Sequence, residues 1–473
     1  MTNLISLINL IPLANIEVRT QQLSTMSGDL GINRRILLFP LPYQGHINPM
    51  LELASLLHLR GFSITIFHTQ FNSIDPTKHP SYDFISIIDG TTSNHFEVNN
   101  FPSRFVEHNN NCEQPFYDSL RKYLSENKGV TCLVADLHWY KIHAVAKRLG
   151  VVSLVLRTGS AASLRWFTSF PVLRAKGYYP LRESEKDELV TELPPYRVKD
   201  LIPMDKCRID DFAMLVERDI EAAKNSSGII INTFTAIESD EIQKLHQELS
   251  VPIFSIGPLH KFTSQFQSSL LPQDRSCLDW LDKQAPGSVL YVSFGSLASL
   301  NYEEFVETAW GLANSRQPFL WVVRPGSVCG TENVSMPDGF DEEIRGRGMV
   351  VAWAPQLEVL AHDAVGGFWT HNGWNSTLEG IWEGVPMICR PFFADQMGNA
   401  RYVTHVWKVG IELEGKLERR IIEKTVRSLM KEKEGDEIRE RMRVLRKNAS
   451  ECTKADGSSH LAINKLVNHI LSL

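Results

Sequence analysis

Short apolar runs separated by helix-length segments limit the fold of this chain more than any other feature. The runs are rich in Val, Ile, Leu and Phe and do not alternate strictly with polar residues, which is typical of parallel strands buried on both faces. They form two sets, at 36–39, 62–67, 84–88, 131–135, 151–156, 228–232 and 253–256, and at 289–294, 319–323, 349–352, 367–370 and 386–389. Two such sets predict an α/β protein with two doubly wound, Rossmann-like domains that face each other across a cleft.

A polar, serine-rich stretch from His260 to Asp274 separates the two sets of runs. The charged, helical pattern after Leu417 predicts a solvated helical surface, whose last helix packs back on the N-terminal domain. Met26 is an alternative start inside a polar N-terminal segment. We therefore predict five parts: a disordered extension at 1–33, an N-terminal domain at 34–258, a linker at 259–285, a C-terminal domain at 286–450 and a C-terminal helix at 451–473.

Composition excludes several classes of protein. The chain has 473 residues with 43% hydrophobic content, which is enough for two full cores. Its formal net charge of −6 argues against a nucleic-acid partner, because phosphate binding needs a basic face. The 7 cysteines include no C-x-x-C pair, which argues against a disulfide framework or a zinc site and favours a reducing compartment. The apolar start lacks the basic region and cleavage site of a signal peptide, so we expect a cytoplasmic protein with no integral membrane segment.

The stretch FPLPYQGHINPM, residues 39–50, places His46 between a predicted strand and a predicted helix. Asn48 and Pro49 predict an N-cap and a first helical residue. A neutral histidine at a helix N-terminus can act as a general base near neutral pH, because the positive end of the helix dipole disfavours the imidazolium. A histidine taken alone is more often structural, so this pattern leaves both interpretations open.

A second motif, WAPQLEVLAHDAVGGFWTHNGWNSTLEGIWEGVPMICRPFFADQ, covers residues 353–396. It predicts a strand, a turn in which Gly373 adopts a positive φ, and a helix from about Trp374, whose N-terminus could hold a pyrophosphate. Structural alternatives exist for several of its residues. Ser376 and Glu379 could form a capping box, Trp353 and Trp374 could be core aromatics, and Asp395 could be an ordinary N-cap.

The whole segment 353–396 resembles the signature box of the family-1 UDP-glycosyltransferases of plant secondary metabolism. The match runs from W-A-P-Q through H-N-G-W-N-S-T-L-E to D-Q, and F-P-x-P-x-Q-G-H-x-x-P at 39–49 resembles the family's N-terminal motif. The similarity covers 35–473, and its N-terminal part is most similar to the subgroup with cytokinin and steviol-glycoside glucosyltransferases. The resemblance implies the GT-B type of fold.

The resemblance also implies a binding site for a UDP-sugar. By that resemblance, the uracil and ribose are held by Trp353, the Ala354 backbone, Gln356 and Glu379; the phosphates by Ser296, His371, Asn375 and Ser376; and the sugar by the Trp374 backbone, Asp395 and Gln396. Thr158 matches a family position near the donor. Gln396 favours glucose over galactose. No metal or other cofactor is expected, since UDP-glucose is a co-substrate and no D-x-D motif lies at a strand end of the cleft.

The resemblance makes His46 the catalytic base and Asp136, at the end of a predicted strand, the acid that orients it. A carboxylate on the second ring nitrogen would set the tautomer and stabilise the imidazolium. We expect direct displacement with inversion at the anomeric carbon, and UDP stabilised by a helix N-terminus and polar donors. His138 and His143 are expected to be acceptor-pocket or surface residues.

The acceptor site is expected within 90–120, 138–145 and 160–215, which are rich in aromatic residues. These include Phe101, Phe116, Tyr140, Trp166, Phe167 and Phe170, some of which could be core residues. The predicted function is inverting transfer of glucose from UDP-glucose to a hydroxyl, carboxyl or amine of a small hydrophobic plant metabolite such as a terpenoid, flavonoid, phenolic or hormone, by a monomer. Two alternatives remain: another UDP-sugar donor, and a non-catalytic metabolite-binding protein. A nicotinamide oxidoreductase is disfavoured, because no G-x-G-x-x-G follows the first strand.

Overall fold

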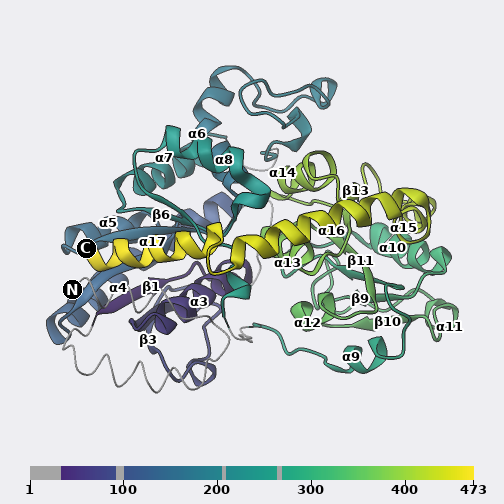
Figure 1. Ribbon diagram of the computed structural model, residues 1–473, viewed down its shortest axis with the longest axis horizontal. Coiled ribbons are helices and arrows are strands. Elements are labelled where there is room, and N and C mark those ends of the chain that lie inside the picture. Colours follow the sequence, from purple (N-terminus) through teal and green to yellow (C-terminus); the bar gives the residue numbers. More distant parts are fainter. Residues whose placement is uncertain (1–33, 92–100, 205–208, 264–268) are drawn as a thin grey trace.

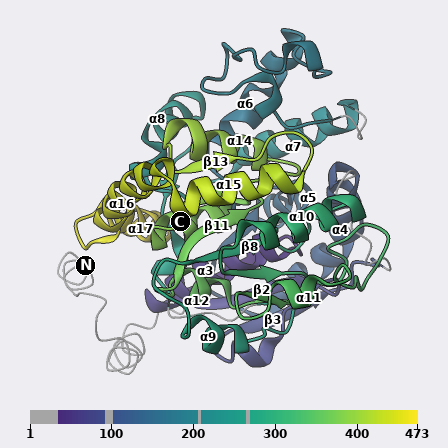
Figure 2. The same cartoon turned by 90° about the vertical axis from the view of Figure 1, so that its right-hand side faces the viewer.

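The computed structural model describes residues 34–91, 101–204, 209–263 and 269–473. It has two lobes, each built around a parallel sheet (Figure 1). Figure 2 views the molecule from the lobe that contains the second sheet. The predicted extension at 1–33 with Met26, Cys207, and the parts of the predicted acceptor segments and linker at 92–100, 205–208 and 264–268 lie outside the described residues.

The first sheet has the order β3-β2-β1-β4-β5-β6-β7, and all its pairs are parallel. Residues of β1 alternate between two apolar clusters: Ile36 and Leu38 face one, and Leu37 and Phe39 face the other. Burial on both faces explains why the run is continuously apolar. The strands are β1 (Arg35–Phe39), β2 (Ser63–Thr69), β3 (Asp83–Ile87), β4 (Val130–Asp136), β5 (Ser153–Arg157), β6 (Ile229–Ile231) and β7 (Ile253–Ser255).

The second sheet has the order β10-β9-β8-β11-β12-β13 and is also parallel. Its strands are β8 (Val289–Ser293), β9 (Phe319–Val322), β10 (Gly348–Val351), β11 (Val365–Thr370), β12 (Met387–Cys389) and β13 (Gly410–Glu412). The prediction of two doubly wound α/β domains is confirmed. Strand β13 was not predicted, because this three-residue edge strand is only half-buried and contains a glycine.

Helices connect most consecutive strands in both lobes; β2 and β3 are joined instead by a segment with one short 3₁₀ helix (Pro76–Lys78), α9 precedes β8, and α15 follows β13. In the first lobe they are α3 (Gln44–Leu59), α4 (Phe101–Glu126), α5 (Tyr140–Arg148), α6 (Ala161–Ala175), α7 (Ile209–Asn225) and α8 (Thr235–Glu248). In the second they are α9 (Ser276–Leu281), α10 (Tyr302–Ser315), α11 (Phe340–Glu343), α12 (Gln356–Leu360), α13 (Trp374–Glu383), α14 (Gln396–Arg401) and α15 (Arg419–Lys431).

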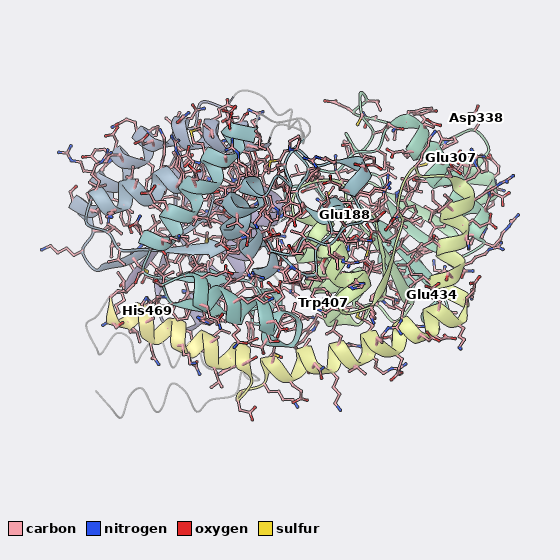
Figure 3. All side chains as sticks on the ribbon, turned by 90° about the horizontal axis from the view of Figure 1, so that it is seen from above. Glu188, Glu307, Asp338, Trp407, Glu434 and His469 are labelled. Carbon is pink, nitrogen blue, oxygen red and sulfur yellow. The ribbon has the colours of Figure 1, made fainter. Side chains whose placement is uncertain are left out.

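The last two helices, α16 (Lys433–Thr453) and α17 (Ser458–Ser472), run from the second lobe to the first (Figures 1 and 3). Figure 3 labels Glu434 and His469 near the two ends of this segment. In α17, Ile463, Leu466 and Ile470 join the apolar cluster that covers one face of the first sheet. His469 Nε2 also lies 2.9 Å from Ser227 Oγ of the first lobe.

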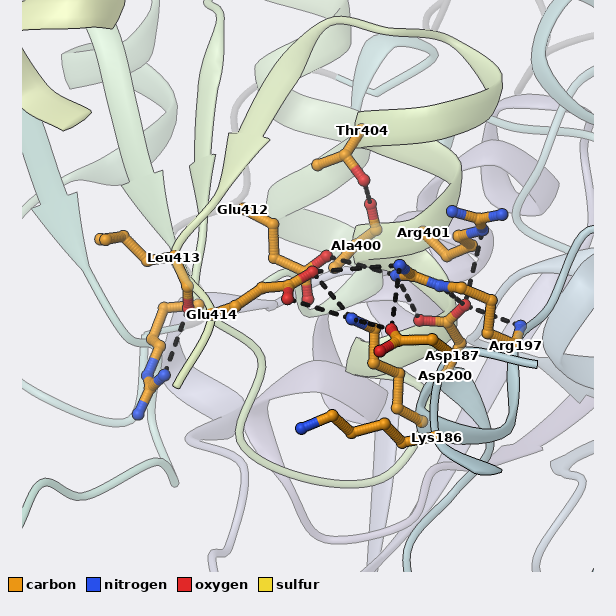
Figure 4. Close-up of polar contacts among 12 residues, drawn as sticks. Lys186, Asp187, Arg197, Asp200, Ala400, Arg401, Thr404, Glu412, Leu413 and Glu414 are labelled. Carbon is orange, nitrogen blue, oxygen red and sulfur yellow. Dashed lines mark hydrogen bonds and ion pairs between the residues drawn. The ribbon is translucent and has the colours of Figure 1, made fainter. Parts of the chain in front are cut away.

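A network of charged residues also joins the lobes (Figure 4). Arg197 donates to Asp200 at 3.0 Å and lies 3.8 Å from Glu412 of β13. Arg401 of α14 donates to the Pro195 carbonyl at 2.9 Å. Burial, with Glu414 and Asp200 nearby, raises the pKa of Glu412 to about 7, despite the opposing effect of Arg197.

Candidate active site

The strand order reverses at one point in each sheet, and candidate residues gather at both points. In the first sheet β1 lies beside β4, so His46, which follows β1, meets Asp136 at the end of β4. In the second sheet β8 lies beside β11, so Ser296 and His371 follow neighbouring strands. Ligands of doubly wound sheets bind at such reversal points, outside the carboxyl ends of the strands.

A cavity of about 710 Å³ lies between the two reversal points. Thirteen of the fourteen residues predicted for the site line this cavity: His46, Thr158, Ser296, Trp353, Ala354, Gln356, His371, Trp374, Asn375, Ser376, Glu379, Asp395 and Gln396. The remaining residue, Asp136, is 1% exposed and lies behind His46. The fold therefore brings segments from both halves of the chain to one cavity.

His46 and Asp136 form a close pair. His46 Nδ1 lies 2.7 Å from Asp136 Oδ2, and Thr158 Oγ1 lies 3.1 Å from the same nitrogen. Burial acts to raise the pKa of Asp136, but His46 and His138 outweigh it, so this pKa lies below its usual value. The ionised aspartate accepts the Nδ1 proton of His46, which leaves Nε2, on the other edge of the ring, to accept a proton.

The helix that carries His46 starts earlier than predicted. Its N-cap is Tyr43, so His46 lies in the first turn and Pro49 lies inside the helix; the N-cap predicted at Asn48 is wrong. Proline has no N–H, so the Gly45 carbonyl four residues earlier has no helical donor. Asn375 Nδ2 of the other lobe donates to this carbonyl at 3.1 Å, which compensates for the missing bond.

The turn before α13 also differs from the prediction. Asn372, not Gly373, has the positive φ, of 60°, while Gly373 has a φ of −57°. Gly373 is needed for space, since a Cβ there would lie 2.4 Å from His371 Nε2. Burial lowers the pKa of His371 to about 4, and Arg324 adds to this effect. His371 is therefore neutral at physiological pH.

Gln356 links two candidate residues of α13. Its Nε2 donates to Ser376 Oγ at 2.9 Å and to Glu379 Oε2 at 2.7 Å. Ser376 is the third residue of the helix, whose N-cap is Gly373, so the capping-box alternative is wrong. Burial raises the pKa of Glu379 to about 7, although the bond from Gln356 acts against it.

The other candidates of the 353–396 segment have varied surroundings. Trp353 and Ala354 pack in the apolar cluster beside β10. Trp374 is a buried aromatic whose Nε1 donates to the Asn232 carbonyl of the first lobe at 2.7 Å. Asp395 occupies the N-cap position of α14 without a capping bond from its side chain. Gln396 Oε1 accepts the Phe392 and Phe393 N–H groups at 2.9 and 3.2 Å, so its amide nitrogen remains as a donor.

The aromatic residues expected at the acceptor site divide into two groups. Phe101 and Phe167 line the cavity, together with Phe105 and Ile202, which lie within the predicted acceptor segments but were not singled out. The remaining four are buried in apolar clusters away from the cavity wall: Phe116, Tyr140, Trp166 and Phe170. Periodicity could not separate the groups, because wall and core positions alternate on the same helices.

Two histidines near Asp136 also have different positions. His138 lines the cavity, and its Nδ1 lies 2.6 Å from Asp219 Oδ2 of α7. His143 is buried, with Nε2 3.3 Å from the Asp136 carbonyl, so the expectation that it is a pocket or surface residue is wrong. Burial lowers the pKa of His143 to about 4.

Sequence reasoning missed three further residues: Asp219, Arg157 and Glu238. Arg157 ends β5 and lines the cavity, and its charge at a strand end was the available signal. Glu238 accepts the N–H groups of Ala161 and Ala162 at 2.9 and 2.8 Å, which supports the loop after Thr158. Its own helix, α8, is kinked at this residue, and no sequence signal indicated that contact.

Within the described residues, no group of three or more His, Cys, Asp and Glu side chains is placed to hold a metal ion. No helix in the same part of the chain is long and apolar enough to cross a membrane.

Comparison with known proteins identifies the family. The family model described as UDP-glucoronosyl and UDP-glucosyl transferase matches residues 254–447. UDP-glycosyltransferase 76B1 of Arabidopsis thaliana is 47% identical over 443 residues, which cover 92% of this chain and 98% of the relative. DIMBOA UDP-glucosyltransferase BX9 of Zea mays is 47% identical over 420 residues, covering 87% of this chain and 90% of the relative.

Solved structures agree with this assignment. Phytolacca americana UGT2, complexed with UDP-2-fluoro-glucose and pterostilbene, has a TM-score of 0.78 at 28% identity and covers 92% of this chain and 99% of its own. A Polygonum tinctorium UDP-glucosyltransferase, in complex with 3,4-dichloroaniline, has a TM-score of 0.79 at 30% identity, with 93% and 99% coverage. The chain is therefore a glycosyltransferase with the GT-B fold and belongs to the plant family-1 UDP-glycosyltransferases.

Proposed function

We propose that this enzyme transfers glucose from UDP-glucose to a hydroxyl of a small apolar metabolite, with inversion, and that His46 is the base. The observation that carries this proposal is the 2.7 Å pair of His46 and Asp136 on the wall of a cavity that also contains the candidate donor-binding residues. One curated relative is named a UDP-glucosyltransferase, and two of the similar solved structures hold small aromatic molecules, which supports a phenolic or similar acceptor.

The donor would lie along the second reversal point. We propose that Trp353, Ala354, Gln356 and Glu379 hold the nucleoside, that Ser296, His371, Asn375 and Ser376 hold the phosphates, and that Trp374, Asp395 and Gln396 hold the sugar. The first turn of α13 offers free N–H groups to the phosphates. Neutral His371 would donate a hydrogen bond there without adding a charge. Thr158 would lie near the donor, and its Oγ1, 3.1 Å from His46 Nδ1, would also help to orient the base.

The proposed step breaks one bond as it forms another. As the acceptor oxygen attacks the anomeric carbon, its proton passes to His46 Nε2. The bond from that carbon to the β-phosphate oxygen breaks, and UDP leaves with the electron pair, stabilised by the helix N-terminus and the polar donors around it. Asp136 stabilises the imidazolium that forms. No residue in this scheme requires a metal or another cofactor.

The remaining predictions stay part of this proposal. They are the boundaries at 34–258, 259–285, 286–450 and 451–473, the monomeric state, the narrower subgroup resemblance, and a cytoplasmic location. All six cysteines in the described residues are free, which supports a reducing compartment. The last boundary cuts the final turn of α16, while the contacts of α17 with the first sheet support its place on the N-terminal domain.

The test is UDP release from UDP-glucose with a panel of flavonoids, terpenoid alcohols, hormones and phenolics, with His46→Ala measured in parallel. We expect release with at least one acceptor and its loss in the variant. Binding of UDP-glucose without turnover of any acceptor would favour the alternative of a metabolite-binding protein. Replacing UDP-glucose by UDP-galactose or UDP-xylose tests the alternative donors.

A further inference from the structure

Arg157 places a buried positive charge at the end of the cavity near His46. It is the last residue of β5, its side chain is 5% exposed, and it lines the cavity. The next residue, Thr158, contacts the His46 ring. Phe101, Phe105, Phe167 and Ile202 line the cavity as well. The arginine therefore lies close to the proposed base and to the aromatic part of the wall, where we place the acceptor.

The bonds that Arg157 makes do not neutralise it. One terminal nitrogen donates to Ser163 Oγ at 2.5 Å, and the other lies 3.3 Å from His138 Nε2. Its guanidinium carbon lies 4.8 Å from the centre of the Phe167 ring, and its Nε is buried without a hydrogen-bond partner. Within the described residues Arg157 has no ion pair. By contrast Lys261, the other Lys or Arg on the cavity wall, lies 2.6 Å from Glu383.

Two carboxylates lie near Arg157 without a direct ion pair. Asp395 Oδ2 and an Arg157 terminal nitrogen both border the space beside Gly159, and Asp219 reaches the arginine only through a histidine. Asp219 Oδ2 lies 2.6 Å from His138 Nδ1, so His138 presents Nε2 to the arginine as an acceptor. Asp219 is 0% exposed, its Oδ1 has no partner, and burial raises its pKa despite the opposing effect of His138. A buried cation without a direct counter-ion is costly, and an anionic ligand would offset that cost.

We propose that the acceptor is a small hydroxy acid whose carboxylate binds Arg157 while its hydroxyl faces His46. The aromatic side chains on the cavity wall would contact its apolar body, and the planar guanidinium suits a carboxylate. His138 and Asp219 would be positioning residues that hold Arg157. This inference rests on the proposed function and adds the chemical class of the acceptor.

A purely structural role for Arg157 makes a different prediction. If the arginine only supports α6 through Ser163 and Phe167, its replacement should lower kcat/KM by the same factor for every acceptor. The informative quantity is therefore the ratio of kcat/KM for an acid to kcat/KM for its methyl ester, which has the same hydroxyl but no charge.

The experiment uses meta- and para-hydroxybenzoate, each beside its methyl ester, with the full-length enzyme and UDP-glucose. We expect the wild type to favour an acid by about tenfold or more, and Arg157→Leu to lower that ratio about 30-fold. Arg157→Lys should restore part of the ratio. The matched control is Arg218→Leu, since Arg218 also stacks on an aromatic ring, that of Tyr140, but does not line the cavity; it should keep the wild-type ratio.

Four results would overturn the inference. A wild type that turns over esters and neutral phenols but no hydroxy acid would do so while the proposed function stands, and this result needs no folded variant. If Arg157→Leu lowers kcat/KM equally for the acid and its ester, the arginine has only a structural role. An alkali-labile glucose ester as product would place the carboxylate at His46 instead. Absence of UDP release with every acceptor tested would remove the proposed function as well.

Discussion

Two histidine–aspartate pairs lie side by side in the first lobe, with ring centroids of His46 and His138 6.0 Å apart. Each histidine presents Nδ1 to a buried aspartate, at 2.7 Å for Asp136 and 2.6 Å for Asp219. They differ at the other nitrogen. His138 Nε2 faces Arg157 at 3.3 Å, whereas His46 is placed on the cavity wall in the first turn of α3.

The aspartates of the two pairs also differ. The pKa of Asp136 is lowered and that of Asp219 is raised, although burial acts to raise both. Both histidines stabilise the ionised form of Asp136, since its Oδ1 also accepts the His138 backbone N–H at 3.1 Å. The comparison teaches that the residue types alone do not make a base. The second ring nitrogen must also be free to meet a substrate.

The largest expected effect separates the two histidines. With a neutral phenol as acceptor, His46→Ala should lower kcat by about 10³-fold, the usual contribution of a general base. His138→Ala should lower it by about fivefold, because His138 takes no proton from the acceptor in this scheme and a neutral phenol does not depend on Arg157. Single-turnover rates at saturating UDP-glucose measure the difference. Equal losses in the two variants would contradict the assignment of the base to His46.

The next effect separates the two aspartates. Asp136→Asn should lower kcat by about 10²-fold, because an amide cannot stabilise the imidazolium of His46. Asp219→Asn should instead lower the acid-to-ester ratio, since it acts through Arg157. Circular dichroism and thermal unfolding of both variants check that they fold. A larger loss of kcat in Asp219→Asn than in Asp136→Asn would reverse the roles given to the pairs.

A third prediction concerns the binding of the donor, which should depend on pH through Glu379 and not through the two histidine–aspartate pairs. The pKa of Glu379 is raised to about 7 by burial, so its carboxylate, the better acceptor for ribose hydroxyls, predominates above that pH. The affinity for UDP-glucose should therefore fall about tenfold as the pH drops from 8.5 to 5.5, the value of one charged hydrogen bond.

Calorimetric titration with UDP-glucose in the absence of an acceptor measures this affinity, and Glu379→Gln is the control. The amide does not titrate, so its affinity should stay nearly constant over the same range. His371, with a pKa of about 4, remains neutral throughout and adds no slope. A wild-type affinity that is independent of pH would argue against contact between the Glu379 carboxylate and the ribose.

The smallest expected effects come from the two hydroxyl groups that lie beside the histidine–aspartate pairs. Thr158 Oγ1 lies 3.1 Å from His46 Nδ1, and Ser163 Oγ accepts from Arg157 at 2.5 Å. Thr158→Val should lower kcat about threefold on any acceptor, as expected for one hydrogen bond. Ser163→Ala should change the acid-to-ester ratio more than kcat for the ester. Steady-state kinetics with a hydroxybenzoate and its ester distinguish these outcomes.

Sequence reasoning predicted the strands and the cavity residues better than the details of turns and helix starts. Each predicted strand lies within two residues of an observed one, because burial on both faces makes the runs continuously apolar. The start of α3 was placed too late because Pro49 suggested a first turn. The missing helical bond is instead compensated by Asn375, whose position depends on the other lobe.

The amino-acid sequence alone determined the two parallel sheets, which depend on local periodicity, and its motifs carried the resemblance that implied the family and the fourteen candidate residues. Only the tertiary structure decided which aromatic residues line the cavity and that Asp219, far along the chain, pairs with His138. It also left Arg157 buried without a direct counter-ion. The physical reason is that burial and electrostatic pairing depend on distances in space, and residues remote in sequence set those distances here.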